Sequence, residues 1–106
     1  MLTDAEYEDL AHKMLVQVEQ AVEVSGAEIE FETEDEILTL EFPDGSRIIV
    51  NKQRPLKQIW VAARSGGFHY HYEPLHKHWV RSGDHELIAD LESFASQQLK
   101  SAVHLR

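Results

Sequence analysis

The chain has 106 residues, of which 42% are hydrophobic, and this is enough to build the core of one compact domain over residues 1–106. It contains no cysteine, which excludes disulfide bonds, thiolate metal sites and cysteine nucleophiles. No apolar run approaches the ~20 residues that span a bilayer, and the N-terminus lacks the features of a signal peptide or an arginine-rich presequence. We therefore expect a soluble, cytoplasmic protein without a membrane partner.

The net charge of −9 is unevenly distributed along the chain. Residues 1–42 carry thirteen acidic side chains and one basic side chain, a net charge of 1 − 13 = −12. Residues 43–106 carry six acidic and nine basic side chains, a net charge of 9 − 6 = +3. Nucleic acid needs a basic surface, so it is not expected as a partner of the acidic half. The asymmetry favours a cation or a basic protein surface instead.

The first predicted element is an amphipathic helix. Thr3 or Asp4 can cap its N-terminus, and Ser25–Gly26 ends it, because glycine readily adopts the left-handed conformation after a last turn. Apolar residues recur at helical spacing, at Tyr7, Leu10, Ala11, Met14, Leu15, Val18, Ala21 and Val22. One sector beside this stripe holds Asp4, Glu8, His12, Glu19 and Glu23.

Strict alternation in SGAEIEFETEDE, residues 25–36, predicts a strand. Apolar or neutral side chains occupy one face, at Ile29, Phe31 and Thr33. Carboxylates occupy the other face, at Glu28, Glu30, Glu32 and Glu34. Oxygen ligands suit hard cations such as iron, manganese, magnesium and calcium. If this strand lies beside the acidic helix flank, the two sets predict a weak, partly hydrated cation site. The alternative is a solubilising flank and a charged edge strand that prevents sheet aggregation.

The remaining predicted elements are strands at 36–42, 47–51, 57–63, 68–72 and about 78–80, and a helix at 84–101 capped by residues 82–84. A hairpin turn at 43–45 joins the first two of these strands. The order predicts an α+β fold, a two-layer sandwich in which both helices pack on one face of an antiparallel five- to six-stranded sheet. The other face of the sheet is then open to water.

Four histidines follow each other in FHYHYEPLHKHW, residues 68–79. His69 and His71 alternate with aromatic residues and share one sheet face, and His76 and His78 repeat that spacing. Paired imidazoles can chelate a transition metal. The alternative is a set of exposed surface histidines, some of them adventitious ligands.

Trp60 is predicted to lie on the open face of the sheet, because Ile59 and Val61 beside it point to the core. Amphipathic or hydrogen-bonding residues accompany it: Asn51, Gln53, Arg54 and Gln58. An exposed tryptophan near arginine is typical of a protein interface. The alternative is a tryptophan packed against its sheet neighbours. The sequence contains no glycine-rich phosphate loop or nucleophile elbow, and we expect no enzyme active site.

Three segments together resemble the frataxin family, in its bacterial CyaY-type branch: NKQRPLKQIW at 51–60, GGFHY at 66–70 and RSG at 81–83. The resemblance covers essentially the whole chain. It implies an iron-binding regulator or iron chaperone of iron–sulfur cluster assembly in the bacterial cytoplasm. It also implies a mostly monomeric protein, with metal-dependent oligomers left open.

By this resemblance, ferrous or ferric iron binds weakly at the surface, and other divalent cations can substitute. The implied metal ligands are Glu19, Glu23, Glu28, Glu30 and Glu32, with Asp4 and Glu8 mapped less directly. The implied partners are a cysteine desulfurase and the iron–sulfur scaffold protein. The implied partner-binding residues are Trp60, Asn51, Gln53, Arg54, Gln58, Glu19 and Glu23.

Departures from the family pattern concern three places. The helix end at 22–26 is poorer in acids, the spacing after Trp79 is shortened, and His71, His76 and His78 are additional. Two other classes of function stay open: a ferroxidase or iron-storage protein using the carboxylates with His12, and a metal-independent acidic adaptor.

Overall fold

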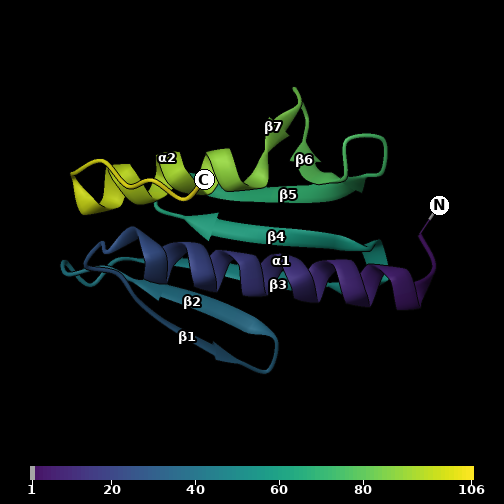
Figure 1. Ribbon diagram of the computed structural model, residues 1–106, viewed down its shortest axis with the longest axis horizontal. Coiled ribbons are helices and arrows are strands. Elements are labelled where there is room, and N and C mark those ends of the chain that lie inside the picture. Colours follow the sequence, from purple (N-terminus) through teal and green to yellow (C-terminus); the bar gives the residue numbers. More distant parts are fainter. Residues whose placement is uncertain (1) are drawn as a thin grey trace.

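The computed structural model describes residues 2–106, which form two α-helices, one 3-10 helix and seven strands. In chain order they are α1 (Asp4–Ser25), β1 (Glu30–Glu34), β2 (Ile37–Glu41), β3 (Arg47–Gln53), η1 (Arg54–Leu56), β4 (Gln58–Ala63), β5 (Gly66–Glu73), β6 (His78–Arg81), β7 (His85–Glu86) and α2 (Leu87–Leu99). Figure 1 shows both helices lying across the same side of the sheet. The predicted α+β sandwich is confirmed.

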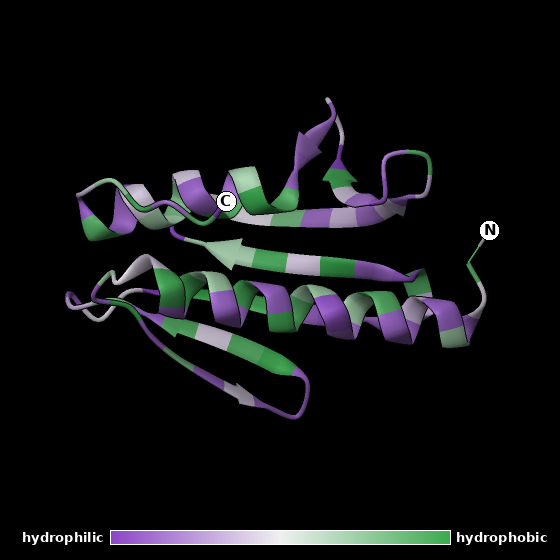
Figure 2. Cartoon of the chain, viewed as in Figure 1, coloured by the Kyte–Doolittle hydropathy of each residue, from purple (hydrophilic) through white to green (hydrophobic). Residues whose placement is uncertain are grey.

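Local signals place α1 as the sequence predicts. The Thr3 side chain accepts a hydrogen bond from the Glu6 amide at 3.1 Å, and the Glu6 carboxylate accepts one from the Thr3 amide at 2.9 Å. This reciprocal capping box satisfies two amides that the first helical turn leaves free. At the other end Gly26 adopts φ 70°, in the left-handed region. The buried residues of α1 belong to its apolar stripe and pack in the core against the sheet. Figure 2 shows hydrophobic and hydrophilic segments alternating along this helix.

All seven strands pair antiparallel in sequence order, from β1 at one edge to β7 at the other. The register fixes which side chains share a face. Val50 lies opposite Val61 in the core layer beneath the helices, whereas Asn51 lies opposite Trp60 on the far face. Because side chains alternate along a strand, every second residue of β2 to β5 faces the open side. No helix in the part of the chain that the structure describes is long and apolar enough to cross a membrane.

The C-terminal third differs from the prediction in two details. Residues 82–84 form a turn into the two-residue strand β7 and do not cap a helix, since Asp84 adopts the left-handed φ of 58°. The cap of α2 is Glu86, whose carboxylate accepts the Ile88 and Ala89 amides at 2.8 and 3.0 Å. The sheet therefore has one strand more than the predicted five to six within residues 2–106.

A largely buried polar triad of Tyr70, Arg81 and Asp90 joins the sheet to α2. The Tyr70 hydroxyl donates to Asp90 at 2.6 Å, and the Arg81 guanidinium donates to the same carboxylate oxygen, also at 2.6 Å. Burial and the Asp90 carboxylate both raise the pKa of Tyr70, so its hydroxyl stays protonated and donates. The triad fixes β5 and β6 against the second helix.

We predict that Tyr70→Phe lowers the free energy of unfolding by about 1.5 to 3 kcal/mol, because Asp90 loses a hydrogen bond to a charged acceptor. Chemical denaturation at pH 7 measures this. The matched control is Tyr72→Phe, because the Tyr72 hydroxyl donates no side-chain hydrogen bond within residues 2–106. Equal losses in the two variants would contradict a specific role for the triad.

Candidate functional site

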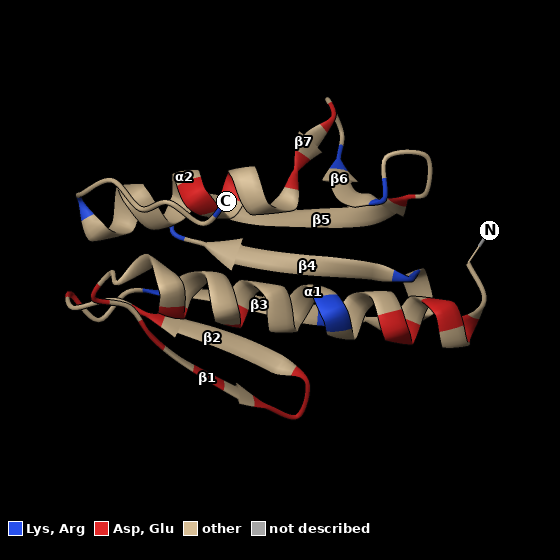
Figure 3. Ribbon diagram, viewed as in Figure 1, with Lys and Arg blue, Asp and Glu red and all other residues tan. Residues whose placement is uncertain are grey.

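The carboxylates of β1 project from the edge of the sheet. All five residues of this strand are exposed. Phe31 and Thr33 lie opposite Leu40 and Leu38, which face the helices, so Glu30 and Glu32 point to the open side of the sheet. In Figure 3 acidic residues alternate with neutral ones along this edge strand, and a continuous acidic run forms the β1–β2 turn.

The acidic flank of α1 reaches the same edge from the other side. Thr33 of β1 donates a hydrogen bond from its hydroxyl to the Glu19 carboxylate. Glu23 follows one helical turn later and is exposed, and Glu28 lies exposed in the connection to β1. We call the set that borders this edge the acidic edge, which consists of Glu19, Glu23, Glu28, Glu30 and Glu32.

The acidic edge lacks basic partners. In residues 2–106, none of its five carboxylates forms an ion pair with a lysine, arginine or histidine. A hollow between the start of β1 and the end of β2 is lined by Glu28, Glu30 and Glu41. Across the same described range, no three acidic-edge side chains bring their ligand atoms within 4.8 Å of one another. The carboxylates therefore border one region without forming a closed coordination shell.

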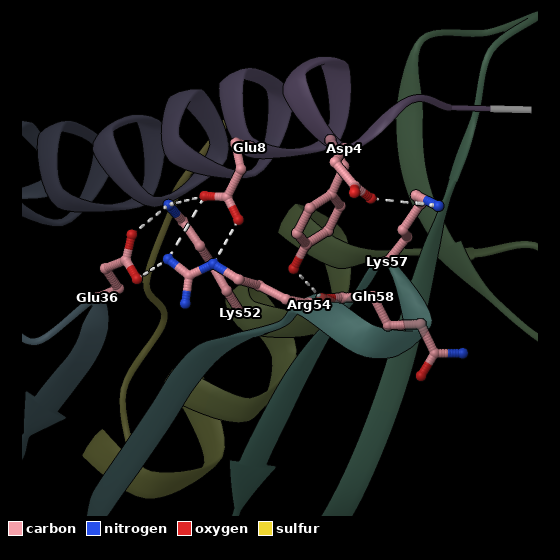
Figure 4. A network of polar contacts seen from close by, with 8 residues as sticks. Asp4, Glu8, Glu36, Lys52, Arg54, Lys57 and Gln58 are labelled. Carbon is pink, nitrogen blue, oxygen red and sulfur yellow. Dashed lines mark hydrogen bonds and ion pairs between the residues drawn. The ribbon is translucent and has the colours of Figure 1, made fainter.

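Asp4 and Glu8 are in a different situation, although both lie on α1. The Lys57 ammonium lies 3.5 Å from Asp4. Glu8 contacts Lys52 at 3.3 Å and Arg54 at 2.5 Å (Figure 4). The protein's own cations thus already face these two carboxylates, and the structure separates them from the acidic edge.

Lys52 and Arg54 form a basic clamp that also holds Glu36, at the β1–β2 turn. Lys52 lies 3.1 Å from Glu36, and the Arg54 guanidinium contacts the same carboxylate. The Lys52 side chain is only 4% exposed, because alternation along β3 directs it toward the helix layer. Burial opposes ionisation of Glu8, but hydrogen bonds from Arg54 and Lys52 outweigh it and hold its pKa below the ordinary value. Sequence reasoning missed this clamp and its partner Glu36.

The open face carries the other residues singled out in the sequence. Trp60 is half-buried and stacks on His69 across the strand pair, with ring centroids 4.3 Å apart and an 11° interplanar angle. Its indole N–H donates to the Gln58 side chain at 2.7 Å. Asn51 lies opposite Trp60 on β3, and Gln53 lies opposite Gln58. The predicted orientation of Trp60 toward the open face is confirmed. The alternative, packing against a neighbouring side chain of the sheet, also holds, because the indole stacks on His69. Arg54 does not join this group, because it belongs to the basic clamp.

Two exposed isoleucines extend the open face toward the acidic edge. Ile37 is 41% exposed and lies opposite Asn51, and Ile49 is 37% exposed and lies opposite Ala62. The sequence analysis did not single out these two residues. Their alternation with core residues in β2 and β3 could have indicated that they face the open side. We call Ile37, Ile49 and Trp60 the apolar patch.

The four histidines of residues 68–79 divide into two groups. His69 and His71 are exposed on the open face. His76 and His78 lie at the β5–β6 turn, near Glu73 and away from the acidic-edge strand (Figure 1). The register of the last strands is resolved, with Tyr72 opposite Trp79.

The arrangement of helices and strands matches solved frataxins. The frataxin from Psychromonas ingrahamii gives a TM-score of 0.89 at 30% identity, over 99% of this chain and 99% of that chain. The trimeric frataxin from Saccharomyces cerevisiae gives a TM-score of 0.65 at 25% identity, over 95% of this chain and 83% of that chain. The molecule is an α+β sandwich of the frataxin class.

Sequence comparison gives the family. Residues 1–101 match the model of the frataxin-like domain. The iron–sulfur cluster assembly protein CyaY of Cupriavidus pinatubonensis is 44% identical, over 98% of this chain and 96% of its own length. The protein of that name from Photobacterium profundum is 38% identical, over 98% of this chain and 92% of its own length. The chain belongs to the frataxin-like family.

Because of the basic clamp, we expect the free energy of unfolding to fall as the pH becomes acidic. The Glu8 pKa is lower in the folded protein than in the unfolded chain, so its contribution is complete above the unfolded pKa and is lost as pH falls through the folded pKa. We predict that Glu8→Gln lowers the free energy of unfolding at pH 7 by about 1 kcal/mol, and that this difference from wild type shrinks on acidification. Denaturation series at several pH values measure it.

The control for this prediction is Glu23→Gln, which removes a carboxylate that has no basic partner. Its stability at pH 7 should equal or slightly exceed that of wild type, because Glu19 and Glu23 are like charges four residues apart on α1. A loss in Glu23→Gln as large as that in Glu8→Gln would contradict the division between neutralised and free carboxylates.

Proposed function

We propose that this protein takes part in iron–sulfur cluster assembly as a non-catalytic, iron-binding regulator. Family membership and relatives named for cluster assembly support this role. The observation that carries the proposal is the acidic edge, five carboxylates without basic partners within residues 2–106, on a chain that neutralises Asp4 and Glu8 internally.

Iron is the cargo that the acidic edge suits. Carboxylate oxygens are hard ligands, and ferrous and ferric ions accept them readily. The ligand atoms are spread along an exposed helix flank and an exposed strand, so bound iron keeps much of its water and the affinity is weak. A bound cation also relieves the repulsion between Glu19 and Glu23, which lie one turn apart.

Docking onto a cysteine desulfurase uses the side of the molecule on which Glu30 and Glu32 of the acidic edge lie. The iron–sulfur scaffold protein is a further partner in the proposal. Glu30 and Glu32 point to the open side of the sheet, the side that carries the apolar patch. A partner that covers the patch therefore meets these carboxylates at its rim. Charged rims accelerate association and orient partners, while buried aromatic residues supply much of the affinity.

A redox role as a ferroxidase is less well supported. It would use carboxylates together with His12. Glu8, one helical turn before His12, is held by Lys52 and Arg54. Releasing it for a metal would leave the buried Lys52 ammonium with Glu36 alone.

The first test is a ferrous iron titration of ¹⁵N-labelled protein without oxygen. We predict paramagnetic broadening of amides near Glu19, Glu23 and β1, because the cation binds at the acidic edge. Glu19→Gln/Glu23→Gln should weaken the apparent affinity at least threefold. Asp9→Asn/Asp84→Asn, which removes equal charge elsewhere, should leave the pattern unchanged.

Two results would contradict this part of the proposal. Broadening that spares α1 and β1 would favour a metal-independent adaptor. Catalytic oxygen uptake after admitting oxygen, with turnover beyond the iron bound, would favour a ferroxidase.

The second test measures binding to a cysteine desulfurase by calorimetry at several salt concentrations. We predict that Glu19→Lys/Glu23→Lys abolishes binding at moderate salt, because it reverses the field that attracts a basic surface. Trp60→Ala should weaken binding by about tenfold or more, the scale of an interface hot spot, with an unchanged circular dichroism spectrum.

Leu75→Ala is the control for Trp60→Ala, because Leu75 is an 82% exposed apolar side chain at the β5–β6 turn. Its binding should equal that of wild type. Unchanged affinity in the double lysine variant would show that the acidic edge is not part of the interface. Unchanged affinity in Trp60→Ala would show the same for the apolar patch.

A further inference from the structure

The hairpin turn between β5 and β6 gathers three metal-ligating side chains far from the acidic edge in the strand order. Within residues 2–106, Glu73, His76 and His78 form the only group of three His, Cys, Asp or Glu side chains whose ligand atoms all lie within 4.8 Å of one another. Their sequence pattern is Glu-x-x-His-x-His. Nothing in the proposed iron or docking role uses them.

The backbone brings these ligands together. Glu73 and His78 are direct partners in the antiparallel register, so their side chains leave the sheet on the same face. Residues 74–77 form the turn, and Lys77 closes it in the left-handed conformation, with φ 55°. His76 then points back over the hairpin to Glu73, with 2.5 Å between its Nδ1 and Oε1 of the carboxylate.

The Glu73 carboxylate is fixed in place before any ligand arrives. It accepts the backbone amides of Leu75 and His76, at 2.6 and 3.0 Å. Such second contacts orient a ligating carboxylate and strengthen metal sites.

The spacing suits a single ion after small side-chain rotations. Ligand atoms at ~2.0–2.1 Å from a tetrahedral metal lie roughly 3.4 Å apart. The observed distances from Glu73 Oε1 bracket this value, at 2.5 Å to His76 Nδ1 and 3.8 Å to His78 Nε2. The imidazoles have room to adjust, since the His76 and His78 side chains are 67% and 36% exposed. When an ion binds Nδ1 of His76, the ring proton moves to Nε2, so the imidazole stays neutral as a ligand.

We propose that Glu73, His76 and His78 form a second cation site that binds one divalent transition metal ion of the imidazole-preferring class, represented by Zn²⁺ or Co²⁺. Two nitrogens and one carboxylate oxygen are a common set for such ions and leave coordination positions for water or a further ligand. The acidic edge offers only oxygens and selects harder cations. The two sites therefore differ in ligand chemistry and in their place on the sheet.

The test titrates Co²⁺ into the full chain and follows the visible d–d absorption, with Zn²⁺ binding measured by calorimetry. We expect one equivalent to bind in wild type, and His78→Gln and Glu73→Gln each to lose at least about tenfold in affinity, because each removes one of three ligands. His104→Gln, which removes an exposed histidine near the C-terminus, should bind as wild type. Glu19→Gln/Glu23→Gln should also bind as wild type.

Wild-type protein gives a second readout that needs no variant. Zn²⁺ should shift the ring ¹⁵N resonances of His76 and His78 and leave that of His104 unchanged. Unchanged rings, or equal affinity in wild type and His78→Gln, would overturn the proposal. So would equal loss in His104→Gln, because the histidines would then bind without a defined site.

Discussion

The ammonium group of Lys52 lies on the core side of β3 with only 4% of its side chain exposed, and a charge so buried needs opposite charges beside it. Glu8 of α1 and Glu36 of the β1–β2 turn supply them, and Arg54 binds the same two carboxylates from η1. The basic clamp thus ties the first helix to the edge hairpin. The clamp neutralises Glu8 near the start of α1 and Glu36 at the turn. The carboxylates of the acidic edge have no basic partner within residues 2–106.

The consequence for binding follows from which way β1 faces. Glu30 and Glu32 point to the open side, while Glu19 reaches the edge from the helix side through Thr33. One negative region therefore wraps around an edge strand and is accessible from both faces of the sheet. A strand edge with unpaired backbone groups invites pairing with other chains, and dense like charge is a common way to prevent it. In this protein the protective charge and the proposed docking charge are the same residues, so the two explanations of the acidic strand do not compete.

Sequence predicted the structure where the determining contacts are local. The ends of α1 follow from Thr3, Glu6 and Gly26, each acting within one turn. The face of Trp60 follows from alternation with Ile59 and Val61. The basic clamp could not be predicted, because Lys52 and Glu8 are 44 residues apart and periodicity says nothing about which helix turn lies over which strand position. Strand β7 was missed for a related reason: two residues pair with β6 only once the turn at 82–84 has directed them there.

The turn that carries Glu73, His76 and His78 lies between these two cases, because its sequence pattern is local but its geometry depends on strand pairing. The pattern Glu-x-x-His-x-His is visible in the chain, yet its meaning depends on register. If the β5–β6 pairing shifted by one residue, Glu73 and His78 would no longer be direct partners and would project from opposite faces. The observed pairing is held by buried Trp79 and partly buried Tyr72, which lie opposite each other on the core side of the hairpin, with ring centroids 5.4 Å apart in an edge-on contact. Buried aromatic packing on one face of the hairpin therefore sets the ligand geometry on the other. The proposed metal site needs no buried ligand, because the core packing fixes the backbone that carries its ligands.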